Sequence, residues 1–329
     1  MKNEPLDHLM GLVDLSEKDI EKERQLSELN DFLEPLEKKL RDEAQPPVRP
    51  VCFIIGPPRS GTTVLTQLLA ATGLFQTTTN FVAGFWKAPA LAIRMSKAAS
   101  LPSSPLDFES ERGRTVGVSA PHEFGYFWSS WFDLGQAFHT LDAVHRARVD
   151  LDGLSRAVGA MEAASTRPLL FKNNTWCTYQ ADMLAVLFPT ARFVVCERDR
   201  FFVAQSILEQ RRKLGDENQW WSVKPLGSDK WAGLTPLQQV ALQTTGIYKD
   251  MANALAGVPS DRICPIDYQR LCTNPRHTVE FILTWFGLGA AYEHTNNLPD
   301  YLVAADAVRL DPLCSGKLVK LLAEYSTET

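Results

Sequence analysis

Several features that mark common protein classes are missing from this sequence. The 329 residues contain no long block of Lys and Arg and carry a net charge of −5, so nonspecific nucleic-acid binding is not indicated. No stretch approaches the roughly 20 apolar residues of a membrane-spanning helix. The first residues, MKNEPLDHLMGLVDLSEKD, lack the uninterrupted apolar core of a signal peptide. These absences predict a cytoplasmic protein with neither a transmembrane segment nor a nucleic-acid partner.

The cysteines lack the spacing of metal or disulfide motifs. Six are present, and they form no CxxC pairs and no clusters with histidine. Zinc sites and disulfide frameworks are recognised by such spacings. We therefore expect reduced cysteines and no metal site. Nothing in the pattern indicates an oligomeric state.

The first 50 residues differ in pattern from the rest of the chain. Leucines at 26, 29, 33, 36 and 40 recur at spacings of three and four among many charges, which predicts an amphipathic helix. The stretch AQPPVRP then ends it. We interpret residues 1–50 as a helical extension and linker that docks on the main domain, because the repeat is too short for a long coiled coil.

Beyond residue 50 the sequence alternates between short apolar runs and helical segments. The apolar runs predict strands at 51–55, 168–171, 192–197 and 262–267. The helices expected after them end near residue 72 or span about 176–187, about 201–213 and about 275–286. This alternation is typical of a parallel sheet flanked by helices, so we predict an α/β domain over residues 51–329. Ligands of such sheets bind at the carboxyl ends of the strands.

Two stretches interrupt the alternation. Residues 74–168 are rich in aromatics and carry helical patterns, and we interpret them as a helical insertion that walls a cleft above the sheet. Residues 211–233 form a lid-like loop with three tryptophans, Trp220, Trp221 and Trp231. Loops of this length are usually lids or binding loops, whereas the tryptophans could also anchor the loop to the body. The two interpretations are compatible.

The stretch GPPRSGTT at 56–63 lies between the first predicted strand and its helix. A glycine-rich turn here exposes successive backbone N–H groups beside a helix N-terminus, which predicts an anion site. Phosphate loops of nucleoside triphosphatases have a lysine after the second glycine, where this chain has Thr62. Arg59 instead supplies a planar cation suited to oxyanions. The expected anion ligands are Arg59, Ser60, Gly61, Thr62 and Thr63.

In its context, VCFIIGPPRSGTTVLTQLL, this stretch resembles the 5′-phosphosulfate loop of sulfotransferases that use 3′-phosphoadenosine 5′-phosphosulfate (PAPS). In that family an arginine after a later strand is followed eight positions on by a serine, and both contact the 3′-phosphate. The segment RFVVCERDRFFVAQSIL provides Arg198 and Ser206 at this spacing. The resemblance therefore implies that both bind the 3′-phosphate of the donor.

Two further segments extend the resemblance over residues 51–288. PLLFKNNTWCTYQADMLAVLFPTARFVV is similar to the LKSP…LFPDARFV stretch of carbohydrate and bacterial sulfotransferases, and RICPIDYQRLCTNPRHTVEFILTWFGL is similar to the YEDL stretch, which places Tyr268 among the donor-binding residues. Asn173 and Asn174 replace the usual Ser-Pro, and Gln269 replaces the usual acidic residue. The glycine-rich RKG element of cytosolic sulfotransferases is not recognisable, which leaves the carbohydrate, tyrosyl-protein and bacterial branches.

The resemblance implies a P-loop-like fold and transfer of a sulfuryl group from PAPS to a hydroxyl acceptor, with adenosine 3′,5′-bisphosphate as product. The implied acceptor is a small molecule, a glycan, a lipid-linked glycan or a tyrosyl side chain, on the side of the 74–168 insertion. Such transfer needs in-line positioning and charge stabilisation, and no metal is required when cations are built in. The resemblance places the catalytic lysine at Lys172, at a strand end that faces the same cleft as the loop with Arg59.

The base that takes the acceptor's proton is expected in the insertion. Two of its histidines, His139 and His145, lie in ordinary helix-like sequence and are expected on the surface. In SAPHEFGYFW, His122 and Glu123 are predicted at a helix start beside an apolar face, where a carboxyl can project into a partly desolvated cleft. Related sulfotransferases with a PRSGTT loop tend to use glutamate, which favours Glu123. Acidic residues are also common in the first helical turn for dipole reasons alone.

Two other functions fit parts of the pattern. A nucleotide or small-molecule kinase needs a lysine at position 62 and a carboxylate at a strand end to hold magnesium, for which Glu197 and Asp199 are the nearest candidates. A noncatalytic protein that kept the nucleotide pocket is the second alternative. Nucleotide preference separates the kinase from a sulfotransferase.

Overall fold

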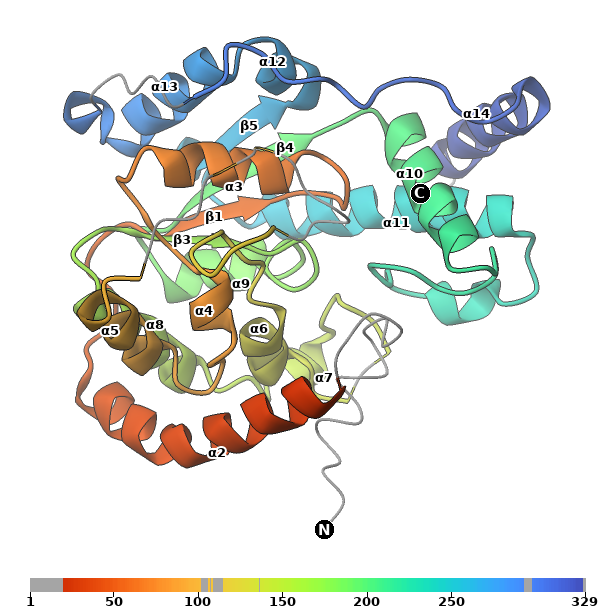
Figure 1. Ribbon diagram of the computed structural model, residues 1–329. Helices are drawn as coiled ribbons and strands as arrows, with labels where there is room; N and C mark the ends of the chain where they lie inside the picture. Colours follow the sequence, from red (N-terminus) through yellow and green to blue (C-terminus); the bar gives the residue numbers. More distant parts are fainter. Residues whose placement is uncertain are drawn as a thin grey trace.

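A parallel β-sheet with helices on both faces organises the chain (Figure 1). The structure is a computed structural model, and it describes residues 20–101, 106, 108, 115–135, 137–292 and 298–327. Residues 1–19, where the sequence predicts no signal peptide, lie outside the described residues, as do parts of the 74–168 stretch. Within the described part, no helix combines the length and apolar character needed to cross a membrane.

The sheet contains five parallel strands in the order β2-β3-β1-β4-β5, which confirms the predicted fold class. The predicted strands are present as β1 (Cys52–Ile55), β3 (Leu169–Lys172), β4 (Arg192–Glu197) and β5 (Ile263–Asp267). The sequence analysis missed β2 (Gln76–Thr77), which pairs with β3 at the edge of the sheet. Two polar residues form no apolar run, so only the pairing itself reveals this strand.

Helices follow the strands as expected, with one difference. α3 (Thr62–Ala71), α10 (Arg200–Lys213) and α13 (Pro275–Phe286) agree with their predicted ranges. α9 (Ala181–Leu187) begins later than predicted, because the Asn173 side chain accepts hydrogen bonds from the N–H groups of Trp176 and Cys177 within a turn. The remaining helices are α4 (Asn80–Ala83), α5 (Pro89–Ala98), α6 (Gly125–Phe132), α7 (Ala143–Arg146), α8 (Leu151–Ala164), α11 (Pro236–Ala256), α12 (Tyr268–Thr273), α14 (Pro312–Thr327) and the 3₁₀ helices η2 (Ser228–Trp231), η3 (Ser260–Arg262) and η4 (Gly289–Ala291).

Alternate residues of the central strands pack into two cores, one on each face of the sheet. Because successive side chains of a strand point in opposite directions, Phe53 belongs to one core and Ile54 to the other. The fully buried ring of Phe53 lies 5.4 Å from that of Phe193 and 5.9 Å from that of Trp128 on α6. α3 and α13 cover the Ile54 face, whereas α6, α8, α9 and α11 cover the other (Figure 1). The aromatic 74–168 stretch is thus fixed to the sheet by core contacts.

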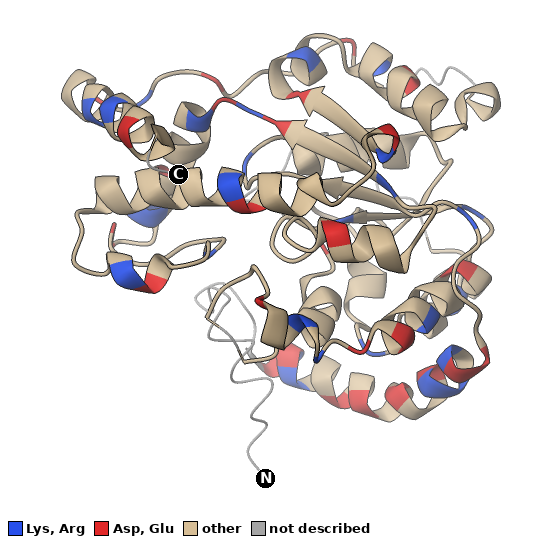
Figure 2. Ribbon diagram, turned by 180° about the vertical axis from the view of Figure 1, so that it is seen from behind, with Lys and Arg blue, Asp and Glu red and all other residues tan. Residues whose placement is uncertain are grey.

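The helix α2 (Ile20–Glu43) confirms the predicted N-terminal helix, and it packs against α5 and α8. The residues that α2 buries are not all the leucines from which the helix was predicted. Leu29 and Leu36 are about half exposed, whereas Asn30 and Glu37 are buried. Charges of both signs run along this helix (Figure 2). Polar contacts therefore contribute to its attachment alongside apolar ones.

Glu37 joins α2 to the beginning of α5. Its carboxylate accepts hydrogen bonds from the backbone N–H groups of Ala90 (2.9 Å) and Leu91 (3.0 Å). The first N–H groups of a helix have no partner inside the helix, and the helix dipole favours a negative charge there. Burial raises the pKa of the Glu37 carboxyl, and the two N–H groups partly offset this effect.

Glu37→Ala is expected to lower the free energy of unfolding by about 1–3 kcal/mol, because it leaves two N–H groups of α5 without their partner. Glu34→Ala is the matched control, since Glu34 lies one turn earlier on α2, is exposed and forms a surface ion pair with Lys87. Its effect should stay within about 0.5 kcal/mol. Urea unfolding followed by circular dichroism measures both values. Equal losses would show that the contact with α5 adds no stability.

Candidate functional site

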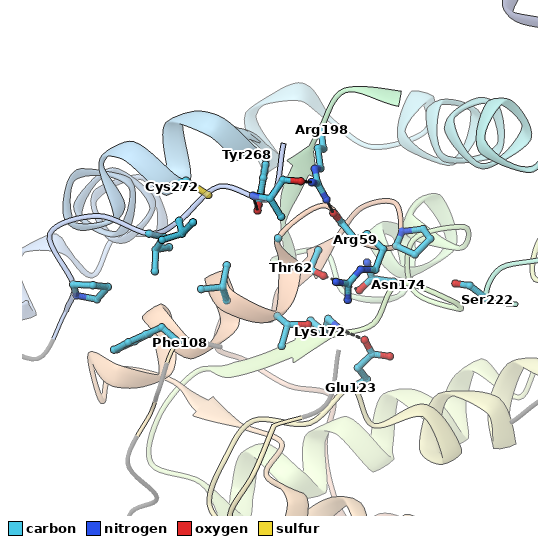
Figure 3. Close-up of a pocket in the computed structure, with 18 of the residues that line it drawn as sticks. Arg59, Thr62, Phe108, Glu123, Lys172, Asn174, Arg198, Ser222, Tyr268 and Cys272 are labelled. Atoms are coloured by element: carbon cyan, nitrogen blue, oxygen red, sulfur yellow. Dashed lines mark hydrogen bonds and ion pairs between the residues drawn. The ribbon is translucent and has the colours of Figure 1, made fainter. Parts of the chain in front are cut away.

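A cavity of about 590 Å³ lies beyond the carboxyl ends of the strands, the edge at which ligands of parallel sheets bind (Figure 3). Its walls include the loop after β1, the last residue of β3 and the residues that follow β4 and β5. Segments from the 74–168 stretch, from the tryptophan loop and from residues 299–305 complete it. The structure thereby brings together the predicted site residues Arg59, Gly61, Thr62, Thr63, Glu123, Lys172, Arg198 and Tyr268.

The loop after β1 turns tightly, and its glycines are required. Gly56 has φ 147°, and an added Cβ would lie 2.6 Å from the carbonyl oxygen of Cys196. Gly61 has φ 90°, and its Cβ would lie 2.7 Å from the ring of Tyr268. Arg59 adopts the left-handed region with φ 67°, a conformation that is costly for a residue with a side chain and is found mainly at functional sites.

The hydroxyls of this loop differ in what they contact. Ser60 is fully buried and donates to the carbonyl of Pro57 (2.7 Å), so its side chain does not reach the cavity. Thr62 donates to the side-chain oxygen of Asn174 (3.0 Å). Thr63 lines the cavity at the beginning of α3, where helix N–H groups and the helix dipole favour an anion. The backbone and Arg59 therefore offer more to an anion than the Ser60 and Thr62 hydroxyls do.

Two arginines are neighbours at the loop, since the Arg198 guanidinium donates to the main-chain carbonyl of Arg59. Arg59 donates from Nε to the Ser206 hydroxyl (3.1 Å), so the contact of Ser206 is with the loop arginine, and its predicted pairing with Arg198 at a 3′-phosphate stays a prediction. Burial, followed by the positive charge of Arg198, lowers the pKa of Arg59. Like charges that are held close together in a partly buried site are relieved when an anion binds.

Arg198 is largely enclosed by the segment before α14. Its Nε donates to the Asp306 carboxylate (2.8 Å), its Nη2 to the carbonyl of Ala305 (2.8 Å), and its Nη1 to the carbonyl of Arg59. The guanidinium also lies 4.4 Å from the ring centre of Tyr268. Asp306 was missed by sequence analysis, because an isolated carboxylate far along the chain carries no motif.

Lys172 and Glu123 form an ion pair at the floor of the cavity (Figure 3). Only 4% of the Lys172 side chain is exposed, compared with 36% for Glu123. Burial and then the charge of Arg59 lower the pKa of Lys172 to about 7. The Glu123 carboxylate opposes these two effects, because a negative charge nearby favours the ammonium form of Lys172.

The two candidates for a base are separated by their surroundings. His122 is exposed, and its Nδ1 accepts a hydrogen bond from the N–H of Phe124 (2.9 Å), away from the cavity lining. Glu123 points to Lys172 inside the cavity. Neither lies in the predicted first helical turn, because α6 begins at Gly125 after Phe124, whose φ of 58° is not helical.

The prediction that His139 lies on the surface is wrong. Its ring is buried, accepts a hydrogen bond from the N–H of Lys224 (3.0 Å) and contacts the ring of Trp176. Burial lowers the pKa of His139 to about 4. The local sequence could not indicate this contact, because the partner loop lies about 85 residues further along the chain. His145 is partly exposed and contacts Asp142, as a surface histidine would.

The tryptophan loop combines anchoring with a wall of the cavity. Trp220 stacks on Arg211, with the guanidinium carbon 4.9 Å from the ring centre, and lies beside Trp231. Gln243 on α11 donates to the carbonyls of Trp221 (2.9 Å) and Val223. Trp221 and its neighbour Ser222 line the cavity. The contacts of Trp220 and Trp231 fit the anchoring interpretation, and the interpretation of the loop as a lid stays a prediction.

The described residues contain no group of three or more His, Cys, Asp or Glu side chains arranged to hold a metal ion. The carboxylates closest in sequence to the strand end have other surroundings. Asp199 accepts a hydrogen bond from the N–H of Phe201 (2.7 Å) at the beginning of α10, and Glu197 is exposed. Neither is among the residues that line the cavity.

Known proteins share this fold and sequence pattern. The sulfotransferase family matches residues 50–292. The crystal structure of sulfotransferase STF1 from Mycobacterium tuberculosis H37Rv is 16% identical with a TM-score of 0.52, covering 92% of this chain and 82% of that chain. Sulfotransferase STF9 from Mycobacterium avium is 14% identical with a TM-score of 0.50, covering 90% and 72%. No curated protein sequence matches the chain.

The two kinds of comparison carry different weight. Identities of 14% and 16% show a shared fold and no more. The family match extends over most of the chain and includes the loop after β1, Lys172 and Arg198. The chain therefore belongs to the sulfotransferase family.

Proposed function

We propose that this protein uses PAPS as donor and transfers its sulfuryl group to a hydroxyl of a small-molecule or glycan acceptor. The observation that carries the proposal is the convergence of Arg59, Lys172 and Arg198 with a lysine-free loop in one cavity. A donor with a 5′-phosphosulfate and a 3′-phosphate needs cations at both ends. Guanidinium groups suit these oxyanions because their N–H groups form a planar fork.

In the proposed reaction the acceptor oxygen attacks sulfur in line with the bond to the 5′-phosphate oxygen. The new S–O bond forms as the old one breaks, and the electron pair of the broken bond stays on the phosphate of adenosine 3′,5′-bisphosphate. Glu123 takes the proton of the hydroxyl. Arg59 and the loop N–H groups stabilise the sulfuryl oxygens, while Lys172 neutralises the leaving phosphate.

The 3′-phosphate is proposed to bind Arg198 and Ser206, beside Tyr268. Arg198 is paired with Asp306 in this structure, so the phosphate would replace that carboxylate. A phosphate and a carboxylate use the same N–H groups of a guanidinium, which supports this exchange.

A kinase has less support than a sulfotransferase. Position 62, where a kinase-type loop has its phosphate-binding lysine, is a threonine whose hydroxyl donates to Asn174. Glu197 and Asp199 do not line the cavity. Glu123 does line the cavity, but it is paired with Lys172, and a site with this surplus of positive charge fits a donor used without magnesium.

The acceptor is proposed to bind between Glu123 of the 74–168 insertion and the loop residues Trp221 and Ser222. An aromatic wall suits a flat or apolar face, such as that of a sugar or phenol ring. Donor binding and catalysis are assigned to residues 51–329, with residues 1–50 as an attached extension.

Adenosine 3′,5′-bisphosphate is expected to raise the melting temperature without metal, and ATP with magnesium is expected to raise it little. A ligand at about 100 times its dissociation constant stabilises the native state by about 2.7 kcal/mol. Differential scanning fluorimetry measures the shift. The reverse order of the two ligands would favour a kinase.

The same assay with variants locates the 3′-phosphate. Arg198→Ala should weaken adenosine 3′,5′-bisphosphate by about 1.5–3 kcal/mol and leave AMP, which lacks the 3′ group, unchanged. Asp306→Asn is the matched control and should bind adenosine 3′,5′-bisphosphate more tightly, because the competing charge is removed. Equal weakening of both nucleotides in Arg198→Ala would place Arg198 at the 5′ end or in the fold.

Donor binding is expected to take up a proton above neutral pH. The pKa of Lys172 is lowered to about 7 in the free protein, and a bound phosphate favours the ammonium form. The dissociation constant of adenosine 3′,5′-bisphosphate should therefore rise from pH 7.5 to 9, by at most about tenfold per unit. Lys172→Arg stays charged and should remove this dependence. Calorimetry in two buffers of different ionisation enthalpy counts the proton, and no uptake in the parent protein would contradict the assignment.

Glu123→Gln is expected to lower kcat by about 10²–10⁴-fold, the usual contribution of a general base. Binding of PAPS should be retained, because the loop and Arg198 remain. His122→Ala should lose much less. Transfer of labelled sulfate to a mixed panel of phenols and glycans measures the rates. Comparable rates for Glu123→Gln and the parent would reject Glu123, and a collapse only in His122→Ala would move the role to that residue.

A further inference from the structure

Two asparagines directly follow Lys172, in place of the Ser-Pro pair that similar sulfotransferase segments carry at this point. Asn173 is 1% exposed and Asn174 is 4% exposed. Burying an amide is unfavourable unless its donors and acceptor find partners. Their partners in this structure are the two segments that carry the proposed chemistry.

Asn174 spans the loop after β1. Its amide nitrogen donates to the carbonyls of Gly56 and Pro57, both at 3.0 Å. Its side-chain oxygen accepts from the hydroxyl of Thr62 at 3.0 Å. One side chain therefore holds the beginning of the loop to the first residue of α3, across the turn that carries Arg59.

Asn173 connects to the segment that carries Glu123. Its amide nitrogen donates to the Glu123 carbonyl (3.3 Å), and its oxygen accepts from the N–H groups of Trp176 (2.6 Å) and Cys177 (3.1 Å). Its backbone N–H donates to the carbonyl of Ile54 on β1 (3.3 Å). The residue next to Lys172 thereby ties the Glu123 main chain to the central strands of the sheet.

We propose that Asn173 and Asn174 are positioning residues with separate tasks, Asn174 holding the donor loop and Asn173 holding Glu123 beside Lys172. This inference rests on the proposed function, since it takes the loop as the donor site and Glu123 as the base. A Ser-Pro pair could not form these contacts, because the side chain of proline has no polar atom and serine has a single short donor. The two asparagines at the end of β3 thus set the distances between the donor loop, Lys172 and Glu123. Errors of about 1 Å in such distances can lower the rate about 100-fold.

The test compares the same substitution at neighbouring positions. Asn174→Ser should raise the dissociation constant of adenosine 3′,5′-bisphosphate by about tenfold at every pH, because two hydrogen bonds to the loop are lost. The serine of Asn173→Ser keeps an acceptor for the turn but cannot reach the Glu123 carbonyl. The dissociation constant of adenosine 3′,5′-bisphosphate for this variant at pH 6.5 should stay within about twofold of the parent value.

The pH dependence separates Asn173 from a merely structural residue. Lys172 is faced by Glu123, Arg59 and the thiol of Cys196. If Asn173→Ser releases Glu123 from Lys172, the ammonium form of Lys172 loses a stabilising charge. The pH at which nucleotide binding begins to take up a proton should then move to lower values. Asn174→Ser should leave that pH unchanged. Calorimetric titrations with adenosine 3′,5′-bisphosphate from pH 6 to 9 give both quantities.

Gln180→Ser serves as the control for losing a buried amide close by. Gln180 is fully buried and donates to the carbonyls of His139 and Trp176. Gln180→Ser should lower the melting temperature and leave unchanged both the dissociation constant of adenosine 3′,5′-bisphosphate and the pH at which proton uptake begins. If Asn173→Ser and Asn174→Ser behave alike, or like Gln180→Ser, the inference is overturned while the proposed function stands. If the parent protein does not bind adenosine 3′,5′-bisphosphate, the proposed function fails first and takes the inference with it.

Discussion

The site depends on holding three positive side chains close together away from bulk water. Arg59, Lys172 and Arg198 come from three different strand ends, and their mutual repulsion would drive them apart on a mobile surface. Backbone carbonyls and two carboxylates, Glu123 and Asp306, keep them in place. The parallel sheet makes this possible, because its strand ends are rigid and adjacent. The lowered pKa values of Arg59 and Lys172 are the sign of that constraint.

The sequence was sufficient for the parts of the fold that depend on local pattern. Buried strands of a parallel sheet are continuous apolar runs, so β1, β3, β4 and β5 could be predicted within a residue or two. The turn after β1 could also be predicted, since Gly56 and Gly61 adopt backbone angles that other residues avoid. The cavity then follows from topology, because parallel strands bring their carboxyl ends to one edge of the sheet.

What could not be predicted depends on partners far along the chain. The edge strand β2 exists only through pairing with β3, and α9 starts late because Asn173 captures two N–H groups ahead of it. The face of α2 that packs on the fold includes Asn30 and Glu37, which hydropathy assigns to solvent. His139 and Asp306 could not be predicted for the same reason, since each has its partner far along the chain and no local pattern indicates that contact.

Under the proposed function, the pairing of Arg198 with Asp306 has a consequence for turnover. Because both groups are nearly buried, a departing nucleotide would otherwise leave an isolated charge in a poorly solvated place, which is costly. A carboxylate on the adjoining segment can take up the guanidinium as the phosphate withdraws, so the charge is handed from one anion to another. Release of the proposed nucleotide product would then be an exchange between two ion pairs of Arg198, and it would not require water to solvate the enclosed guanidinium.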